Sequence, residues 1–311
     1  MSTVKSYLSL VKFSHTIFAL PFALIGFFLG AKYWNEITGY FSHSGVSSQD
    51  VLTQYQIPSS LEQVGVRFLL VLVCMVTARS AAMAFNRYLD RSFDAKNPRT
   101  AIREIPKGII SANSALRFVI LNCVVFVTAT FFINRICFFL SPIALFVILF
   151  YSYTKRFTPL CHLVLGLGLS LAPIGAYLAV TGKFDLLPVL FSIAVICWVS
   201  GFDIIYALQD IDFDKSQKLY SIPSVLGKSR ALRVSELLHA VSAACVVCAG
   251  VYGHFHWLYW VGVAVFIGML IYQHSIVKPG DLSKVNIAFM TANGIASVVF
   301  GVLVIADIVL V

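Results

Sequence analysis

The residues that could perform chemistry are concentrated in two acidic clusters. The 311-residue chain has 14 acidic residues, and the two clusters contain Asp90, Asp94, Asp203, Asp210, Asp212 and Asp214. Each cluster includes Asp-x-x-x-Asp, a spacing that places both carboxylates on one face of a helix. Carboxylates on one face repel each other, so a cation should compensate them. Mg²⁺ suits such hard oxygen ligands, and it usually binds a few carboxylates together with substrate phosphates.

Basic residues are interleaved with these acids. They are Arg87, Arg91, Lys96, Arg99 and Arg103 at the first cluster, Lys215, Lys218 and Lys228 at the second, and Lys155 with Arg156 between the two. A metal ion together with Arg and Lys is the arrangement expected for a diphosphate leaving group. Any single one of these bases could instead be a membrane anchor on the cytoplasmic side.

One further base, Arg79, lies inside an apolar stretch, two turns before Asn86 on the same helix face. A charged residue within a membrane span is a functional candidate by default. Arg79 could hold an anionic group of a substrate, or it could pair with an acidic neighbour such as Asp203.

The composition sets the class of protein in which these residues must be placed. Hydrophobic residues make up 59% of the chain and charged residues only 12%, against about 25% charged residues in an ordinary soluble domain. A soluble protein of this length cannot hide so much apolar surface, which excludes a cytosolic globular enzyme, a disordered chain and a nucleic-acid-binding module. The apolar runs are continuous and lack the alternation of a barrel, so the sequence predicts membrane helices.

Nine apolar segments have the length of roughly 20 residues that a transmembrane helix needs. They are 14–33, 66–88, 115–134, 136–154, 160–181, 186–206, 236–254, 257–276 and 287–309. Only Asn134 and Arg135 divide the third segment from the fourth, so we expect a tight turn there. The sequence thus predicts an all-α, polytopic membrane bundle of about nine transmembrane helices, with residues 1–311 forming a single domain.

The distribution of Lys and Arg predicts the orientation of the bundle. These residues lie mainly beside the N-terminus and in the loops after the second, fourth, sixth and eighth spans. Cytoplasmic loops carry such an excess, so we expect the N-terminus and both acidic clusters on the cytoplasmic side. The net charge of +9 therefore indicates cytoplasmic loops and not a nucleic-acid partner.

The two clusters also match two longer patterns. Asn86-Arg-Tyr-Leu-Asp90-Arg-Ser-Phe-Asp94 fits NxxxDxxxD, and Asp203-Ile-Ile-Tyr206-Ala-Leu-Gln-Asp210-Ile-Asp-Phe-Asp214 fits DxxYAxxDxxxD. In these patterns the chain resembles the UbiA superfamily of membrane prenyltransferases. The resemblance covers nearly the whole chain, including the number of spans. Within the superfamily, the chain is most similar to 4-hydroxybenzoate polyprenyltransferases and their bacterial menaquinone-pathway relatives.

Two departures from the ubiquinone-type pattern concern the acceptor. That pattern continues Asn-Arg-Pro-Leu after the first motif, where this chain has Arg103-Glu104-Ile-Pro106-Lys-Gly108. The Pro-Ile-Gly of its first helix is also absent, and Ser14-His-Thr-Ile-Phe-Ala-Leu-Pro resembles the first helix of the menaquinone-pathway relatives. The acceptor could thus be 4-hydroxybenzoate or 1,4-dihydroxy-6-naphthoate.

The resemblance implies transfer of a polyprenyl group from a polyprenyl diphosphate to an aromatic acid in quinone biosynthesis, with Mg²⁺ as the cofactor. The resemblance also implies a protein of the bacterial plasma (inner) membrane. Its apolar bundle would receive the isoprenoid tail through an opening to membrane lipid. The metal ligands would be Asp90, Asp94, Asp210 and Asp214. The groups assisting the metal and the diphosphate would be Asn86, Arg99, Lys155, Arg156, Asp203 and Tyr206, and Arg79 would recognise the carboxylate of the acceptor.

A cation-coupled transporter is the alternative from a different class, because it too would place acids in a membrane bundle. Transporters hold their carboxylates near the bilayer midplane, often at broken helices. Here the acidic clusters lie at the ends of spans and continue into loops rich in Arg and Lys, which favours the enzyme.

Overall fold

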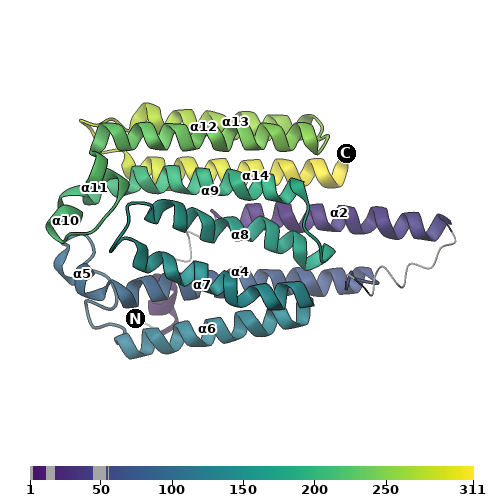
Figure 1. The fold of residues 1–311 in the computed structure, drawn as a ribbon, viewed down its shortest axis with the longest axis horizontal. Helices are drawn as coiled ribbons and strands as arrows, with labels where there is room; N and C mark the ends of the chain where they lie inside the picture. The colour runs from purple at the N-terminus through teal and green to yellow at the C-terminus, as the bar shows by residue number, and fades with distance from the viewer. Residues whose placement is uncertain (1–2, 12–17, 45–53, 55) are drawn as a thin grey trace.

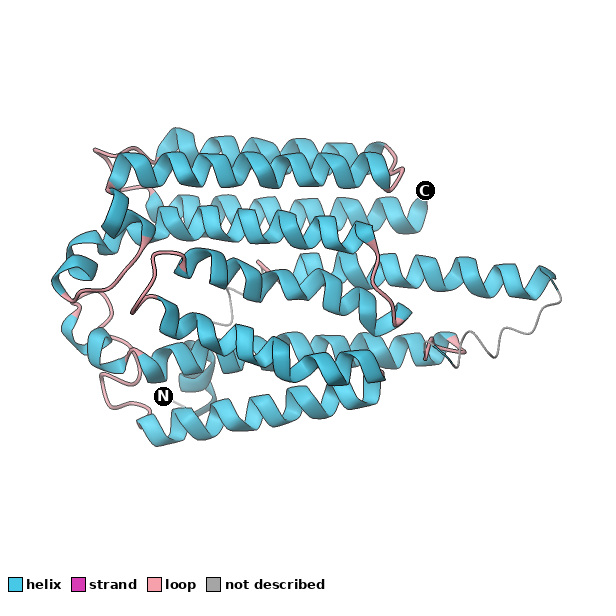
Figure 2. Ribbon diagram, viewed as in Figure 1, coloured by secondary structure: helices cyan, strands magenta, loops and turns pink. Residues whose placement is uncertain are grey.

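The structure is a computed structural model that describes residues 3–11, 18–44, 54 and 56–311. Within these residues every regular element is a helix, apart from one β-bridge between Lys278 and Asp281 (Figures 1 and 2). The long helices are α2 (Leu20–Ser44), α4 (Leu61–Leu89), α6 (Ala112–Ile133), α7 (Arg135–Thr154), α8 (Cys161–Thr181), α9 (Leu186–Ala207), α12 (Lys228–Tyr252), α13 (Trp257–Ile276) and α14 (Asn293–Leu310). The short ones are α1 (Thr3–Leu10), α5 (Arg91–Lys96), η2 (Leu208–Asp210), α10 (Ile211–Ser216), α11 (Ile222–Leu226) and η3 (Ile287–Ala292).

The predicted all-α membrane bundle is confirmed. Eight of the helices in the described part are long and apolar enough to cross a membrane. The long helix α2 corresponds to the first predicted span, but residues 14–17 of that span lie outside the described residues. α2 also continues to Ser44, well beyond the predicted end at residue 33, and α12 begins eight residues before residue 236, at Lys228. The predicted bounds are too short because hydropathy detects only the apolar part of a helix. The helical backbone hydrogen bonds continue into the polar residues beside it.

The tight turn predicted between the third and fourth spans is confirmed at Asn134. This residue alone separates α6 from α7, and its side chain accepts a hydrogen bond of 2.9 Å from the backbone N–H of Cys137. Its Nδ2 donates to the carbonyl of Leu178 at the end of α8, at 2.8 Å. One Asn therefore begins α7 and satisfies a carbonyl at the end of a neighbouring helix, where both groups would otherwise be unpaired.

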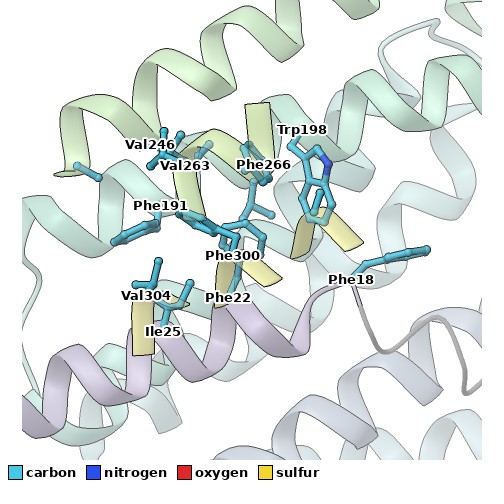
Figure 3. Close-up of a cluster of buried hydrophobic side chains, with 14 of the residues drawn as sticks. Phe18, Phe22, Ile25, Phe191, Trp198, Val246, Val263, Phe266, Phe300 and Val304 are labelled. Atoms are coloured by element: carbon cyan, nitrogen blue, oxygen red, sulfur yellow. The ribbon is translucent and has the colours of Figure 1, made fainter. Parts of the chain in front are cut away.

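The core of the bundle lies where α2 packs against α8, α9 and α14. Figure 3 shows aromatic side chains at its centre, among them Phe22, Trp198, Phe266 and Phe300, which are fully buried. Close helix packing requires a glycine here, because a Cβ at Gly26 would come within 2.0 Å of the carbonyl oxygen of Pro173. Hydroxyl groups also link the helices, as they often do in membrane bundles: Ser192, Ser235 and Ser242 each donate to a backbone carbonyl of another helix.

Asp307 of α14 holds the start of α13 at the end of the bundle opposite α5 and α10 (Figure 1). Its carboxylate is 1% exposed and accepts hydrogen bonds from the backbone N–H groups of His256 (2.9 Å) and Tyr259 (3.1 Å). We expect Asp307→Ala to destabilise the protein by about 2 kcal/mol, because it leaves the buried backbone N–H of Tyr259 at the start of α13 unpaired. Asp307→Asn keeps an acceptor and should lose less. Thermal unfolding in detergent measures both, and an unchanged Tm for Asp307→Ala would contradict this role.

The other end of the bundle carries both acidic clusters. α5, α10 and α11 lie together there, at the left of Figure 1, with the loops that connect α5 to α6 and α7 to α8. Two motifs that are far apart in the sequence are thus brought to one end of the molecule.

Candidate active site

The first acidic motif lies where α4 meets α5. α4 ends at Leu89 and α5 begins at Arg91, so the single helical face predicted for Asn86, Asp90 and Asp94 is interrupted at Asp90, whose backbone (φ −89°, ψ 6°) leaves the α-helical region. Asp90 and Asp94 are still joined by a helical backbone hydrogen bond, because the N–H of Asp94 donates to the carbonyl of Asp90 at 2.8 Å. The Nδ2 of Asn86 donates to Asp90 Oδ2 at 3.1 Å, as their spacing predicted.

The second acidic motif runs from α9 through η2 into α10. Asp203 is on α9, Asp210 ends η2, and Asp214 is on α10. The Asp214 side chain is fully buried and accepts a hydrogen bond of 2.9 Å from the hydroxyl of Ser221, which caps α11. The cap of one short helix therefore fixes the orientation of a carboxylate on another.

Two adjacent bases bridge the motifs. Lys155 and Arg156 follow α7, and their side chains go to different motifs: Lys155 Nζ lies 2.7 Å from Asp214 Oδ1, and Arg156 Nη2 lies 3.3 Å from Asp90 Oδ1. The backbone carbonyl of Lys155 also accepts from the N–H of Tyr220 at 2.7 Å. The loop after α7 thus joins the two halves of the site.

Arg99 makes a second bridge, from the loop after α5 to the second motif. Its Nε donates to Asp210 Oδ1 at 3.1 Å, its Nη2 pairs with Asp210 Oδ2, and its Nη1 donates to Tyr206 Oη at 2.8 Å. The guanidinium also lies over the Tyr206 ring, 5.2 Å from its centre. Such a two-point pairing fixes the position of Arg99 more firmly than a single contact would.

The protonation of these groups follows from burial and charge. Burial raises the pKa of the Asp90 carboxyl, and it raises the pKa of Asp94 to about 6 against the opposing charge of Arg87. Burial alone would lower the pKa of Lys155, but the carboxylate of Asp214 outweighs it and raises that pKa. Lys155 is therefore a permanent cation. With a pKa of about 6, the Asp94 carboxyl is about half protonated at pH 6, and a further cation beside it would lower that pKa.

The four predicted metal ligands gather at one end of the bundle but do not form a ready metal cage. Among the described residues, no three acidic, His or Cys side chains are grouped closely enough to hold a metal ion. Each carboxylate is instead paired with a base: Asp90 with Arg156, Asp94 with Arg103, Asp210 with Arg99, and Asp214 with Lys155. A buried carboxylate needs such a partner. The residues nevertheless fit Mg²⁺, because all four are hard oxygen ligands and Asp94 Oδ2 is buried with no hydrogen-bond partner.

Arg79 lines a cavity of about 410 Å³ between α4, α6, α7 and α8. The walls are mainly apolar, and Tyr151 is one of the few other polar side chains in them. The Nε of Arg79 is buried with no hydrogen-bond partner. Of the two roles considered for Arg79, pairing with an acidic neighbour such as Asp203 is not seen in the described part of the chain, where Arg79 makes no ion pair and Asp203 Oδ2 bonds to a histidine. A base in an apolar cavity remains available to an anionic ligand.

That histidine, His162, is a site residue that sequence reasoning missed. It is 3% exposed at the start of α8, and its Nε2 accepts from the backbone N–H of Ile222 at 3.3 Å. Nδ1 therefore carries the proton and donates to Asp203 Oδ2 at 2.7 Å. Arg103 was also left out of the predicted site, although its Nη1 lies 2.6 Å from Asp94 Oδ1. Its place in the basic loop after the first motif was the available signal, whereas nothing near His162 in the sequence indicated a partner.

Comparisons with known proteins show the family of this chain. A family model described as the UbiA prenyltransferase family matches residues 51–295. A 4-hydroxybenzoate octaprenyltransferase of Francisella tularensis is 27% identical over 76% of this chain and 81% of its own length. One of Tolumonas auensis is 28% identical over 73% of this chain and 79% of its own length.

Two solved structures share the fold. The apo structure of a UbiA homologue from Aeropyrum pernix has a TM-score of 0.77 at 29% identity, covering 94% of this chain and 98% of the other. A UbiA homologue from Archaeoglobus fulgidus, solved with DMAPP and Mg²⁺, has a TM-score of 0.71 at 19% identity, covering 98% of this chain and 100% of the other.

Proposed function

This chain belongs to the UbiA prenyltransferase family, and from this premise we propose that it transfers a polyprenyl group from a polyprenyl diphosphate to an aromatic acid of the 4-hydroxybenzoate type. The observation that carries the proposal is the interleaving of four carboxylates with four bases at one end of an apolar bundle. Acids paired with bases at helix ends suit a diphosphate with its cation better than they suit a transport pathway through the midplane.

In the proposed complex the charged groups exchange partners. Asp90, Asp94, Asp210 and Asp214 would hold Mg²⁺, with Asn86 and Asp203 assisting. The bases that now neutralise these carboxylates would then be free to pair with the diphosphate oxygens. When bound, Mg²⁺ supplies Lewis-acid stabilisation of the leaving group. The carboxylates would then face the metal ion and the bases would face the diphosphate, so that no buried charge would be left alone.

The bases of the site would stabilise the charge that develops on the leaving diphosphate. As the allylic C–O bond breaks, Arg99, Lys155 and Arg156 would hold the departing oxygens. Tyr206 would hold Arg99 in place, because its hydroxyl accepts a hydrogen bond of 2.8 Å from Arg99 Nη1. The acceptor carbon ortho to the phenol forms the new C–C bond and then loses its proton. The apolar walls of the cavity would keep out the water that would otherwise quench the cation.

The cavity that contains Arg79 would hold the acceptor and the beginning of the isoprenoid tail. Its apolar lining matches both groups, and its single unpartnered Arg matches a carboxylate. We infer that the protein lies in a bacterial plasma membrane with this site on the cytoplasmic side, which the distribution of Lys and Arg supports.

Replacing Arg79 should weaken binding of the acceptor only. We expect Arg79→Gln to raise the KM of the aromatic acid by about 10-fold to 100-fold, because one charge-assisted hydrogen bond contributes about 1.5–3 kcal/mol. The KM of the polyprenyl diphosphate should stay unchanged. Initial rates with each substrate varied in turn measure this. An equal rise in both KM values would contradict a role confined to the acceptor.

A naphthoate acceptor is the second candidate, and the loop that departs from the ubiquinone-type pattern favours it. In that loop Arg103 pairs with Asp94, and Glu104 accepts a hydrogen bond from Ser9 of α1. One residue of this loop, Arg103, thus contacts the first motif directly.

Parallel assays with 4-hydroxybenzoate and 1,4-dihydroxy-6-naphthoate test the choice of acceptor. Prenylation of 4-hydroxybenzoate alone supports the first candidate, and prenylation of the naphthoate alone replaces it with the second. Failure of both acids would contradict the proposed acceptor class.

A further inference from the structure

α14 is preceded by one turn of π-helix, Ile287–Ala292. Single π-helical turns within α-helices are rare and often lie at functional sites. In such a turn the backbone hydrogen bonds join residue i to residue i+5 in place of i+4, and a side-chain donor beside the turn can give its carbonyls a further hydrogen bond. The turn lies far along the sequence from both acidic motifs, and the mechanism above does not use it.

Asn293, the first residue of α14, satisfies this turn. Its Nδ2 donates to the carbonyls of Ala288 (3.2 Å) and Phe289 (3.0 Å). Its Oδ1 accepts from the Trp198 indole N–H (2.9 Å) and from Gln273 Nε2 (2.8 Å). Asn293 is fully buried, and so are the donors Trp198 and Gln273. Asn293 therefore fixes the π-turn to α9 and α13 through bonds that water does not reach.

The π-turn in turn supports the active site. Phe289 of the turn packs against the Tyr206 ring, with ring centres 4.3 Å apart. Phe289 also contacts Phe18 and Phe202, with ring centres at 5.5 Å in each case. The Tyr206 hydroxyl accepts a hydrogen bond from Arg99, whose guanidinium pairs with Asp210. One continuous series of contacts thus leads from Asn293 to the second acidic motif.

We propose that Asn293 is a positioning residue for Arg99, acting through Phe289 and Tyr206, and that the π-turn sets the affinity of the site for diphosphate. The proposal rests on the proposed function, because Arg99 is assigned there to the diphosphate. Without the Asn293 side chain, four hydrogen bonds are lost, among them the bonds from the two buried donors of Trp198 and Gln273. The turn should then rearrange, and Phe289 should leave the Tyr206 ring. Arg99 would then lose the surface that aligns it with Asp210.

A double-mutant cycle on the purified full-length chain tests this proposal. The readout is the Kd of inorganic diphosphate in the presence of Mg²⁺, with kcat/KM for prenyl transfer measured alongside. We expect Asn293→Leu to raise the Kd about 10-fold in the wild-type background and less than about 2-fold in the Arg99→Ala background, because residues that act through one another are not additive. The Tm of each variant is recorded for comparison.

Asn122→Leu is the matched control. Asn122 is a buried Asn of α6 whose Nδ2 donates to the carbonyl of Phe118 four residues earlier, at 2.7 Å, as Asn293 does to Phe289. It is expected to change the Tm but not the Kd. If Asn293→Leu does not fold, Phe289→Leu takes its place in the cycle with the same expected result.

The two readouts separate failure of this proposal from failure of the proposed function. The positioning role would be overturned if Asn293→Leu raised the Kd of diphosphate by the same factor in the wild-type and Arg99→Ala backgrounds. It would also be overturned if the wild-type protein did not bind diphosphate. A wild-type protein that binds diphosphate but prenylates no aromatic acid would overturn the proposed acceptor, while the cycle on Kd would still decide the role of Asn293.

Discussion

Asp94→Asn and Asp214→Asn are each expected to lower the rate of prenyl transfer by about 10³-fold at saturating substrates. Loss of a ligand weakens Lewis-acid stabilisation of the leaving group, which is worth several kcal/mol, and about 4 kcal/mol corresponds to three powers of ten. Asn can still accept the hydrogen bond from Ser221 that Asp214 accepts now. The loss should therefore come from charge and not from packing.

Asp212→Asn is the matched control for this prediction. Asp212 belongs to the same acidic cluster and the same helix, α10, but it is exposed and is not among the proposed ligands. Its rate should stay within about 2-fold of the wild-type rate, the size of change expected of an exposed polar substitution. Equal losses in Asp212→Asn and Asp214→Asn would mean that the carboxylates act only through the overall charge of this end of the bundle.

Lys155→Met should lower kcat by about 10²-fold to 10³-fold, the usual cost of losing one donor to a developing negative charge. Lys155 is held by the fully buried carboxylate of Asp214, and its pKa is raised. The variant therefore removes a cation that is present at every working pH. It also leaves Asp214 without its base, so Tm should be measured together with kcat.

Two control variants test whether the loss of kcat is specific to the charge at position 155: Lys155→Arg and Lys215→Met. The first keeps the charge but changes its shape, and it should recover part of the lost kcat. The second removes an exposed base of the same region and should leave kcat unchanged. A kcat that falls equally in Lys155→Met and Lys215→Met would contradict a specific role for Lys155.

The sequence predicted the parts of the site that have local spacing. Asn86 bonds to Asp90, one helical turn away, and the two motifs share one end of the bundle. The bases that bridge the motifs were predicted as a group because they lie in loops on the same side of the membrane as the acids. Which base pairs with which acid could not be predicted, since Lys155 and Arg156 are neighbours in the sequence yet contact opposite motifs.

Contacts between distant helices could not be predicted. The partner of Asp203 is His162, on a different helix, and no spacing rule connects the two. The hydropathy of Ile287–Ala292 indicates an apolar span, but it carries no sign that this turn is a π-helix or that Asn293 completes it. Such features depend on tertiary packing, which a pattern of apolar residues does not encode.

The most direct test of the account is the Mg²⁺ dependence of prenyl transfer by membranes that contain the full-length chain. The membranes would receive an allylic polyprenyl diphosphate and the two candidate acids, with and without a chelator of divalent cations. We expect a prenylated acid together with released diphosphate, loss of both products with the chelator, and their return when excess Mg²⁺ is added. Formation of the product at an unchanged rate in the presence of the chelator would contradict the proposal that the paired carboxylates hold Mg²⁺ for the leaving diphosphate.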